Sequence, residues 1–148
     1  MTIEQLSFAA LTGTLKAAGE ATRLRILALL AEAELTVSDL TDILRQSQPR
    51  LSRHLRLLAE AGLVERFREG SWAFFRLAER GGGADIARAL IERLDSADAT
   101  IIRDRDFAFA KPVPIVGRRR LGRRIFGFGR SRHNRKVACA PASRQGQG

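Results

Sequence analysis

Cysteine, histidine and long apolar runs are scarce in this chain of 148 residues, and each shortage excludes a class of site. Cys139 is the only cysteine, so one chain cannot form an internal disulfide, a two-thiol redox switch or a multi-cysteine metal site. The only histidines are His54 and His133, which leaves few ligands for soft metal ions. We therefore expect neither a bound metal nor a cofactor.

Other absences bear on location and catalysis. No apolar run approaches the roughly 20 residues that a membrane helix needs, and the N-terminal MTIEQLSFAA lacks the basic region and cleavage site of a signal peptide. A soluble, cytoplasmic protein with no membrane partner is expected. No nucleophile elbow or phosphate loop is found, and Gly81-Gly82-Gly83 does not fit a dinucleotide fingerprint. The sequence offers no catalytic residues, and we expect no enzyme.

Acidic residues are absent from the last 42 positions, which changes the meaning of the net charge of +10. Residues 1–106 carry a net charge of −1, whereas residues 107–148 hold 11 Lys and Arg and no Asp or Glu. The excess of positive charge thus belongs to the tail. DNA binding by the N-terminal region must depend on where individual arginines lie.

Apolar residues recur at helical spacing over most of the first hundred positions. Thr36 is a suitable N-cap, and Ser47 is a second one because Pro49 fits only the first turn of a helix. Gly62 is the residue type favoured just after a helix. The expected helices cover residues 5–18, 21–34, 37–44, 48–61 and 85–94.

The exception is LVERFREGSWAFFRL (63–77), in which two runs rich in Val, Phe and Trp flank Glu69-Gly70-Ser71. This pattern predicts a β-hairpin whose alternation puts Ala73, Phe75 and Leu77 on one face and Arg76 on the other. The order of elements predicts a mainly α winged helix-turn-helix fold. We expect it to occupy residues 1–104, followed by a basic tail of low order over residues 105–148.

The segment SQPRLSRHLRLLAEAG (47–62) has the character of a recognition helix. At 100° per residue its leucines cluster on one face, and Arg53 lies nearly opposite, flanked by Arg50 and Arg56. A helix of this kind can lie in the major groove of DNA while its leucines hold it to a core. The alternative is that the charged face is merely solvated, as most such faces are.

The residue types assign roles along this surface. Arg50 and Arg53 suit bidentate contacts to guanine, and Gln48 suits adenine. Hydroxyl and guanidinium groups also suit phosphates, and a hairpin next to a recognition helix can reach the flanking backbone. The expected phosphate contacts are Ser47, Ser52 and Arg56 on the helix and Arg66 and Arg68 on the hairpin.

The stretches ATRLRILALL, ELTVSDL and SQPRLSRHLRLLAEAGLVERFREGSWAFFRL resemble the ArsR/SmtB family of winged-helix repressors over about residues 5–95. The resemblance implies a homodimer that binds double-stranded operator DNA and represses transcription until a signal weakens binding. Family dimers pair through the first and last helices, which implies that Leu6, Ile86, Leu90 and Leu94 lie at the interface. Packing within the monomer is the alternative for each. The resemblance also favours a base or phosphate contact for His54, rather than a metal or catalytic role.

The inducing signal stays open. Metal-sensing members carry thiolates in the stretch that reads ELTVSDL here, whereas the hydroxyls of Thr36 and Ser38 are poor metal ligands. The alternative metal site on the last helix needs histidine, and residues 85–95 contain none. Some relatives respond to small molecules, so an effector of that class stays open.

The region through DATIIRDRD resembles the front of proteins in which such a regulator is fused to an S-adenosylmethionine-dependent methyltransferase domain. No glycine-rich loop of that domain follows. Because acidic residues and periodicity are lost near residue 106, we interpret the tail as a frameshift or truncation product; the alternative is a native basic tail. The alternative functions are a detached DNA-binding front end of such a fusion, or a general nucleic-acid-binding module that uses the basic tail.

Overall fold

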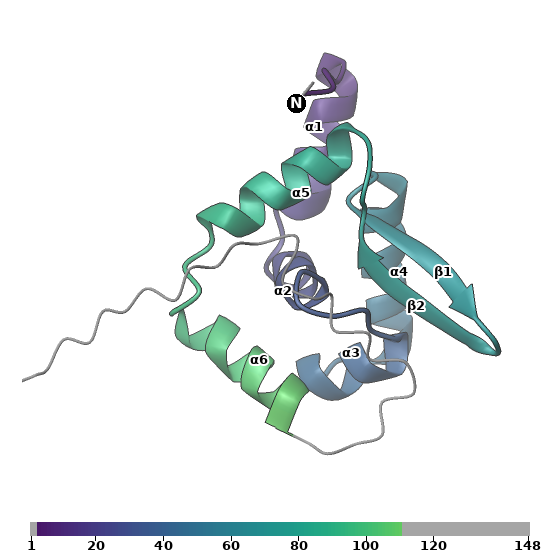
Figure 1. Cartoon of the computed structure of the whole chain (residues 1–148), viewed down its shortest axis with the longest axis vertical. Helices are drawn as coiled ribbons and strands as arrows, with labels where there is room; N and C mark the ends of the chain where they lie inside the picture. The colour runs from purple at the N-terminus through teal and green to yellow at the C-terminus, as the bar shows by residue number, and fades with distance from the viewer. Residues whose placement is uncertain (1–2, 111–148) are drawn as a thin grey trace, which may run out of the picture.

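The computed structural model describes residues 3–110, so the expectations for the tail beyond residue 110 lie outside the described residues. The elements follow the order of a winged helix-turn-helix, with one further helix at the end (Figure 1). Among the described residues, no helix is long and apolar enough to span a bilayer. The elements are α1 (Phe8–Ala18), α2 (Ala21–Leu30), α3 (Val37–Leu44), α4 (Gln48–Glu60), β1 (Val64–Glu69), β2 (Trp72–Leu77), α5 (Gly82–Arg93) and α6 (Ala99–Ala110).

The two central helices of the motif begin where their capping signals predict. The Thr36 hydroxyl accepts a hydrogen bond from the backbone N–H of Asp39, and the Asp39 carboxylate accepts one from the backbone N–H of Thr36. This capping box starts α3, which ends at Arg45 in a left-handed conformation with φ 55°. Pro49 lies in the first turn of α4.

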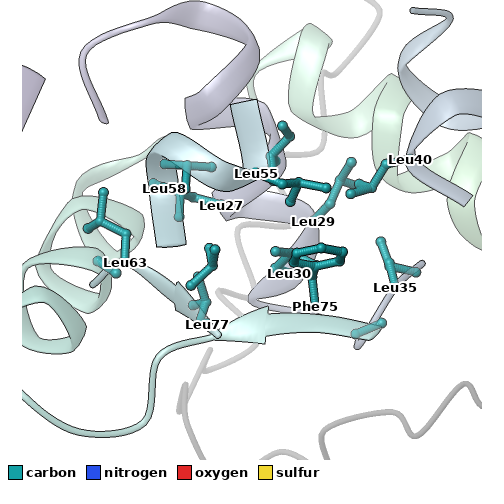
Figure 2. Close-up of a cluster of buried hydrophobic side chains, with 14 of the residues drawn as sticks. Leu27, Leu29, Leu30, Leu35, Leu40, Leu55, Leu58, Leu63, Phe75 and Leu77 are labelled. Atoms are coloured by element: carbon teal, nitrogen blue, oxygen red, sulfur yellow. The ribbon is translucent and has the colours of Figure 1, made fainter. Parts of the chain in front are cut away.

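The core is formed by leucines that α2 and α4 direct toward each other and toward β2 (Figure 2). Helix α2 lies in the middle of the fold and packs against α1, α4, α5, α6 and β2. On α4 the buried residues are Leu51, Leu55 and Leu58, which is the face that the helical spacing predicted. The opposite face of α4 is thereby left for solvent or a partner.

Helix α2 is shorter than the sequence predicted. It ends at Leu30 instead of continuing to residue 34, because the chain has to leave the helix before Leu35 pairs with β2. The backbone N–H of Leu35 donates to the carbonyl of Phe75 at 3.1 Å, and the N–H of Phe75 donates to the carbonyl of Leu35 at 2.8 Å. This pairing ties the base of the hairpin to the chain segment that leads into α3.

The hairpin forms at the predicted place, with Gly70 at φ 59° in its turn. Ala73, Phe75 and Leu77 share one face of β2 as expected. Arg76 lies on the other face, which is less polar than the alternation suggested, because Phe74 is also buried there and stacks on Phe67 with 5.6 Å between ring centroids.

Helix α5 begins earlier than expected, at Gly82 instead of about residue 85. A Cβ on Gly83 would collide with the carbonyl of Gly62, and one on Gly82 would collide with the Leu6 side chain. Glycine therefore lets the start of α5 approach the end of α4 closely. The fully buried face of α5 consists of Ala84, Ala87 and Ile91, whereas Ile86, Leu90 and Leu94 are half-buried.

Helix α6 packs on α2 and α3 (Figure 1). Two hydrogen bonds join it to α2: Arg25 Nε to Asp104 Oδ2 at 2.6 Å and Arg25 Nη2 to Asp104 Oδ1 at 2.8 Å. The guanidinium of Arg45 lies 4.9 Å from the ring centroid of Phe107. The expected domain boundary after residue 104 therefore falls inside a packed helix that continues to Ala110.

Helix α1 begins at Phe8, three residues later than predicted, because the Ser7 hydroxyl accepts a hydrogen bond from the backbone N–H of Ala10 and caps it. Its buried residues are Thr14 and Ala18. Three large apolar side chains point outward: Phe8 is 89% exposed, Leu11 39% and Leu15 49%. An apolar stripe on the surface of a helix indicates a protein interface.

Candidate nucleic-acid interface

The outer face of α4, which we call the reader face, carries Gln48, Arg50, Ser52, Arg53 and Arg56. All five side chains are exposed, while the leucines on the opposite face fix the helix in the core. The sequence predicted this division correctly. A helix held in this way presents its exposed polar side chains in a fixed order, as readout of a DNA groove requires.

Four arginines on α4 and β1 have no acidic partner among the described residues. Within residues 3–110, Arg50 and Arg53 on α4 and Arg66 and Arg68 on β1 form no ion pair. Arg56 makes only a long contact of 4.0 Å with Glu60, and both side chains are exposed. Positive charge concentrates here although residues 1–106 carry a net charge of −1.

The hairpin, which we call the wing, shares a groove with the reader face. Gln48, Ser52 and Arg56 line one side of this groove and Arg66 lines the other. The register explains why: Arg66 is opposite Phe75 and Arg68 is opposite Ala73, so both arginines leave the face of the wing that is turned toward the core. The structure thus brings Arg56 of the helix and Arg66 of the wing to one groove.

Ser47 lies at the N-cap position of α4, but its hydroxyl accepts no hydrogen bond from the first turn. The first backbone N–H groups of α4 therefore point outward without a side-chain cap. A helix N-terminus attracts anions through these N–H groups and the helix dipole. Ser47 and the start of α4 are suited to a phosphate.

His54 has neighbours that the sequence did not indicate. Its side chain is only 12% exposed, and Nδ1 lies 3.3 Å from Nη1 of Arg23 and 3.8 Å from Oε2 of Glu20. Burial lowers the pKa of His54, Glu20 opposes this shift, and the nearby arginines add to it. The ring therefore joins α4 to the start of α2.

The sequence analysis missed a positioning role for Arg76 at the base of the wing. Its Nε lies 3.1 Å from Oε2 of Glu65, and its Nη1 lies 3.3 Å from Oε1 of Glu79 and 3.8 Å from Oε1 of Glu34. The guanidinium also lies 5.0 Å from the ring centroid of Phe67. These contacts join both strands to the segment before α3. The hairpin register, which pairs Glu65 with Arg76, was the available signal.

The described part of the chain offers no metal-binding site. No group of three His, Cys, Asp or Glu side chains there is placed to hold an ion. The Thr36 hydroxyl is occupied by the capping box, and Ser38 is exposed beside it.

A second groove lies between the N-terminal segment and α5, with a volume of about 990 Å³. Leu6 and Ile86, both expected at a dimer interface, line it together with Ile3 and Leu11. Leu90 and Leu94, which were expected there as well, are half-buried against the core. The exposed stripe Phe8, Leu11 and Leu15 on α1 was not anticipated.

Residues 20–66 match the family described as "Bacterial regulatory protein, arsR family". The chain is 48% identical to the arsenical resistance operon repressor of Escherichia coli over 64 residues, which cover 43% of this chain and 55% of that protein. It thus spans about half the length of that repressor. It is 43% identical over 81 residues to an uncharacterized HTH-type transcriptional regulator of Methanocaldococcus jannaschii, covering 54% of this chain and 85% of that protein.

The fold is similar to a solved structure of the same kind. The crystal structure of the transcriptional repressor BigR from Xylella fastidiosa matches with a TM-score of 0.51 and 31% sequence identity. The match covers 57% of this chain and 82% of that chain.

Proposed function

Because the chain belongs to the arsR family of bacterial regulatory proteins, we propose that it is a transcriptional repressor that binds double-stranded operator DNA as a homodimer. The observation that carries the proposal is the set of four arginines without acidic partners, Arg50, Arg53, Arg66 and Arg68, on two elements that border one groove. Phosphates and base edges of DNA would supply the missing acceptors. Such binding places the protein in the cytoplasm, with the DNA.

The reader face gives each side chain a role. Arg50 and Arg53 form bidentate contacts to guanine, each worth about 1–3 kcal/mol of discrimination, and Gln48 contacts adenine. Ser47, Ser52 and Arg56 bind phosphates along the same groove. Arg66 and Arg68 of the wing bind the backbone beside the operator. His54 positions α4 through Arg23 and Glu20 and makes no base contact in this proposal.

The dimer forms through α1 and α5. The exposed stripe Phe8, Leu11 and Leu15 supplies the apolar surface, and the groove lined by Leu6 and Ile86 receives it from the second copy. Leu90 and Leu94 support the interface from the side of the core. A twofold axis there would set the two copies of α4 about one DNA turn apart, which matches a partly palindromic operator.

The experiment is a nuclease footprint of the purified full chain on the DNA upstream of its own gene. The proposal predicts protection of a partly palindromic segment whose half-sites are separated by about one helical turn, roughly 10 base pairs. Uniform protection without a bounded segment would show nonspecific binding and would contradict the proposal. A reporter gene placed behind that segment then tests the sign of regulation, because a repressor lowers its expression.

A further inference from the structure

The groove between α4 and the wing, which we call the reader–wing groove, is hollow as well as charged. It has a volume of about 560 Å³, and Val37 at the start of α3 lines part of it. Cavities of about 300–1,000 Å³ are typical of sites for small molecules. The groove is therefore large enough to hold a small ligand beside the elements that contact DNA.

The floor of this groove is apolar, which distinguishes it from a simple path for phosphates. Leu55 and Phe75 form part of the floor, and their exposed fractions are only 1% and 7%, so the hollow reaches the core. Val37, Ala59 and Ala73 extend the apolar lining on three sides. A phosphate would gain no binding free energy from such a floor. An apolar ring would bury its surface there, which contributes about 25 cal/mol of binding free energy per Å² of apolar surface.

The rim of the groove adds an aromatic ring and two cations. Trp72 is 48% exposed at the mouth, although large aromatic side chains are usually covered in a soluble domain. Arg56 and Arg66 stand on opposite sides, and Arg66 has no ion pair within the described residues. A ligand that fits this arrangement carries an aromatic ring for the floor and Trp72 and a negative group for the arginines.

We propose that the reader–wing groove binds a small aromatic carboxylate and that this ligand releases the operator. The proposal rests on the DNA-binding function proposed above, because the ligand would act on the same elements. A carboxylate between Arg56 and Arg66 takes acceptor positions that DNA phosphates would fill, and the ring occupies the space between the reader face and the wing. A ligand that binds only the free protein must lower DNA affinity, and DNA must lower ligand affinity by the same factor.

Trp72 makes the test direct, because it is the only tryptophan in the chain and it lines this groove. The probes are 4-nitrobenzoate, whose nitroaromatic ring quenches tryptophan fluorescence, and the uncharged 4-nitrobenzyl alcohol. Each is titrated into the full chain without DNA, by fluorescence and by calorimetry. The expected result is saturable quenching with one site per chain and a dissociation constant below about 1 mM. The alcohol should bind at least about tenfold more weakly because it lacks the charge.

Two variants with the same substitution locate the site. Ala59→Phe fills the groove from an exposed position of α4, and Ala99→Phe adds the same ring at an exposed position of α6. The proposal predicts that Ala59→Phe weakens 4-nitrobenzoate binding at least about tenfold and that Ala99→Phe leaves it unchanged. Absence of saturable binding below about 1 mM, or equal binding by both variants, would overturn the proposed site.

Operator competition separates this proposal from the proposed function. In the wild type 4-nitrobenzoate should raise the dissociation constant for the operator, and in Ala59→Phe the same concentration should have little effect. Probe binding with no effect on operator affinity would refute the regulatory role. If the probe binds the groove but the full chain binds no operator, the proposed DNA-binding function is wrong. The proposed release mechanism is then wrong as well, whereas the ligand site is retained.

Discussion

Arg66 and Phe75 lie directly opposite each other in the wing. Opposite residues of an antiparallel pair leave the same face of the sheet, and Phe75 is in the core, so Arg66 leaves the face that looks toward α4. Arg68 leaves the same face because it is opposite Ala73. The wing thereby directs two arginines that form no ion pair among the described residues to its α4-facing side.

Replacing both wing arginines should weaken DNA binding without changing which sequence is preferred. Arg66→Ala with Arg68→Ala removes two expected phosphate contacts per chain, and thus four in the homodimer. At about 0.9 per contact, the slope of log affinity against log salt concentration should therefore become shallower by about 3.6. Fluorescence anisotropy with labelled operator over a salt series measures this slope. An unchanged slope would show that the wing does not contact the DNA backbone.

Breaking the ion pair between α2 and α6 should destabilise the fold. The Asp104 side chain is 4% exposed and the Arg25 side chain 20%, so Asp104→Ala leaves a largely buried cation without its partner. We expect the free energy of unfolding to fall by about 3 kcal/mol, measured by urea denaturation. Asp106→Ala, at an exposed position of the same helix, is the control and should change it by less than about 0.5 kcal/mol. Equal effects of the two variants would mean that the pair does not anchor α6.

Protonation of His54 should make stability depend on pH. Burial holds its pKa below the ordinary value of 6.5 in the folded chain, against the attraction of Glu20, so the unfolded chain takes up the proton first as pH falls. The free energy of unfolding should therefore decrease as pH falls below 6.5 and stop decreasing, for this group, below the folded pKa. The His54→Gln variant should lose this component of the decrease. Parallel pH profiles for the wild type and the variant would contradict the buried position of the ring.

The elements that local signals control could be predicted from the sequence. The start of α3 follows from Thr36 and Asp39, and the first turn of α4 follows from Pro49, because capping and proline act within one turn. The buried leucines of α4 follow from helical spacing, and the arginines of its reader face lie opposite them. The pattern therefore predicted which face of α4 is buried and which is exposed.

The differences arise where a distant contact decides the outcome. The helix predicted over residues 21–34 ends at Leu30 because Phe75, 40 residues after Leu35, holds Leu35 by backbone hydrogen bonds. The side chain of His54 turns to Arg23 and Glu20 on another helix, which the sequence of α4 alone cannot reveal. The start of α5 at Gly82 depends on its close approach to Leu6 and to the end of α4. The exposed stripe on α1 can be identified only from the structure, which shows that α1 buries Thr14 and Ala18.

The apolar stripe on α1 gives a test of the dimer. Phe8→Glu replaces a side chain that is 89% exposed in the single chain, so the monomer fold should be unaffected. A charge buried at the interface should instead separate the copies, and sedimentation equilibrium should show a mass near 16.4 kDa where the wild type shows twice that mass. Ala97→Glu adds the same charge at an exposed position before α6 and should leave the dimer intact. A dimer that persists in Phe8→Glu would place the interface elsewhere.

The reader face is tested most directly by operator binding of the double variant Arg50→Ala with Arg53→Ala. Its control is Arg80→Ala with Arg93→Ala, which removes the same charge at two exposed positions outside the reader face. With anisotropy of the footprinted operator against a scrambled duplex, we predict that the reader variant loses at least about 30-fold in affinity for the operator, and that the control loses little. Equal operator affinity of the two variants, with both folded, would contradict the assignment of α4 as the element that reads DNA.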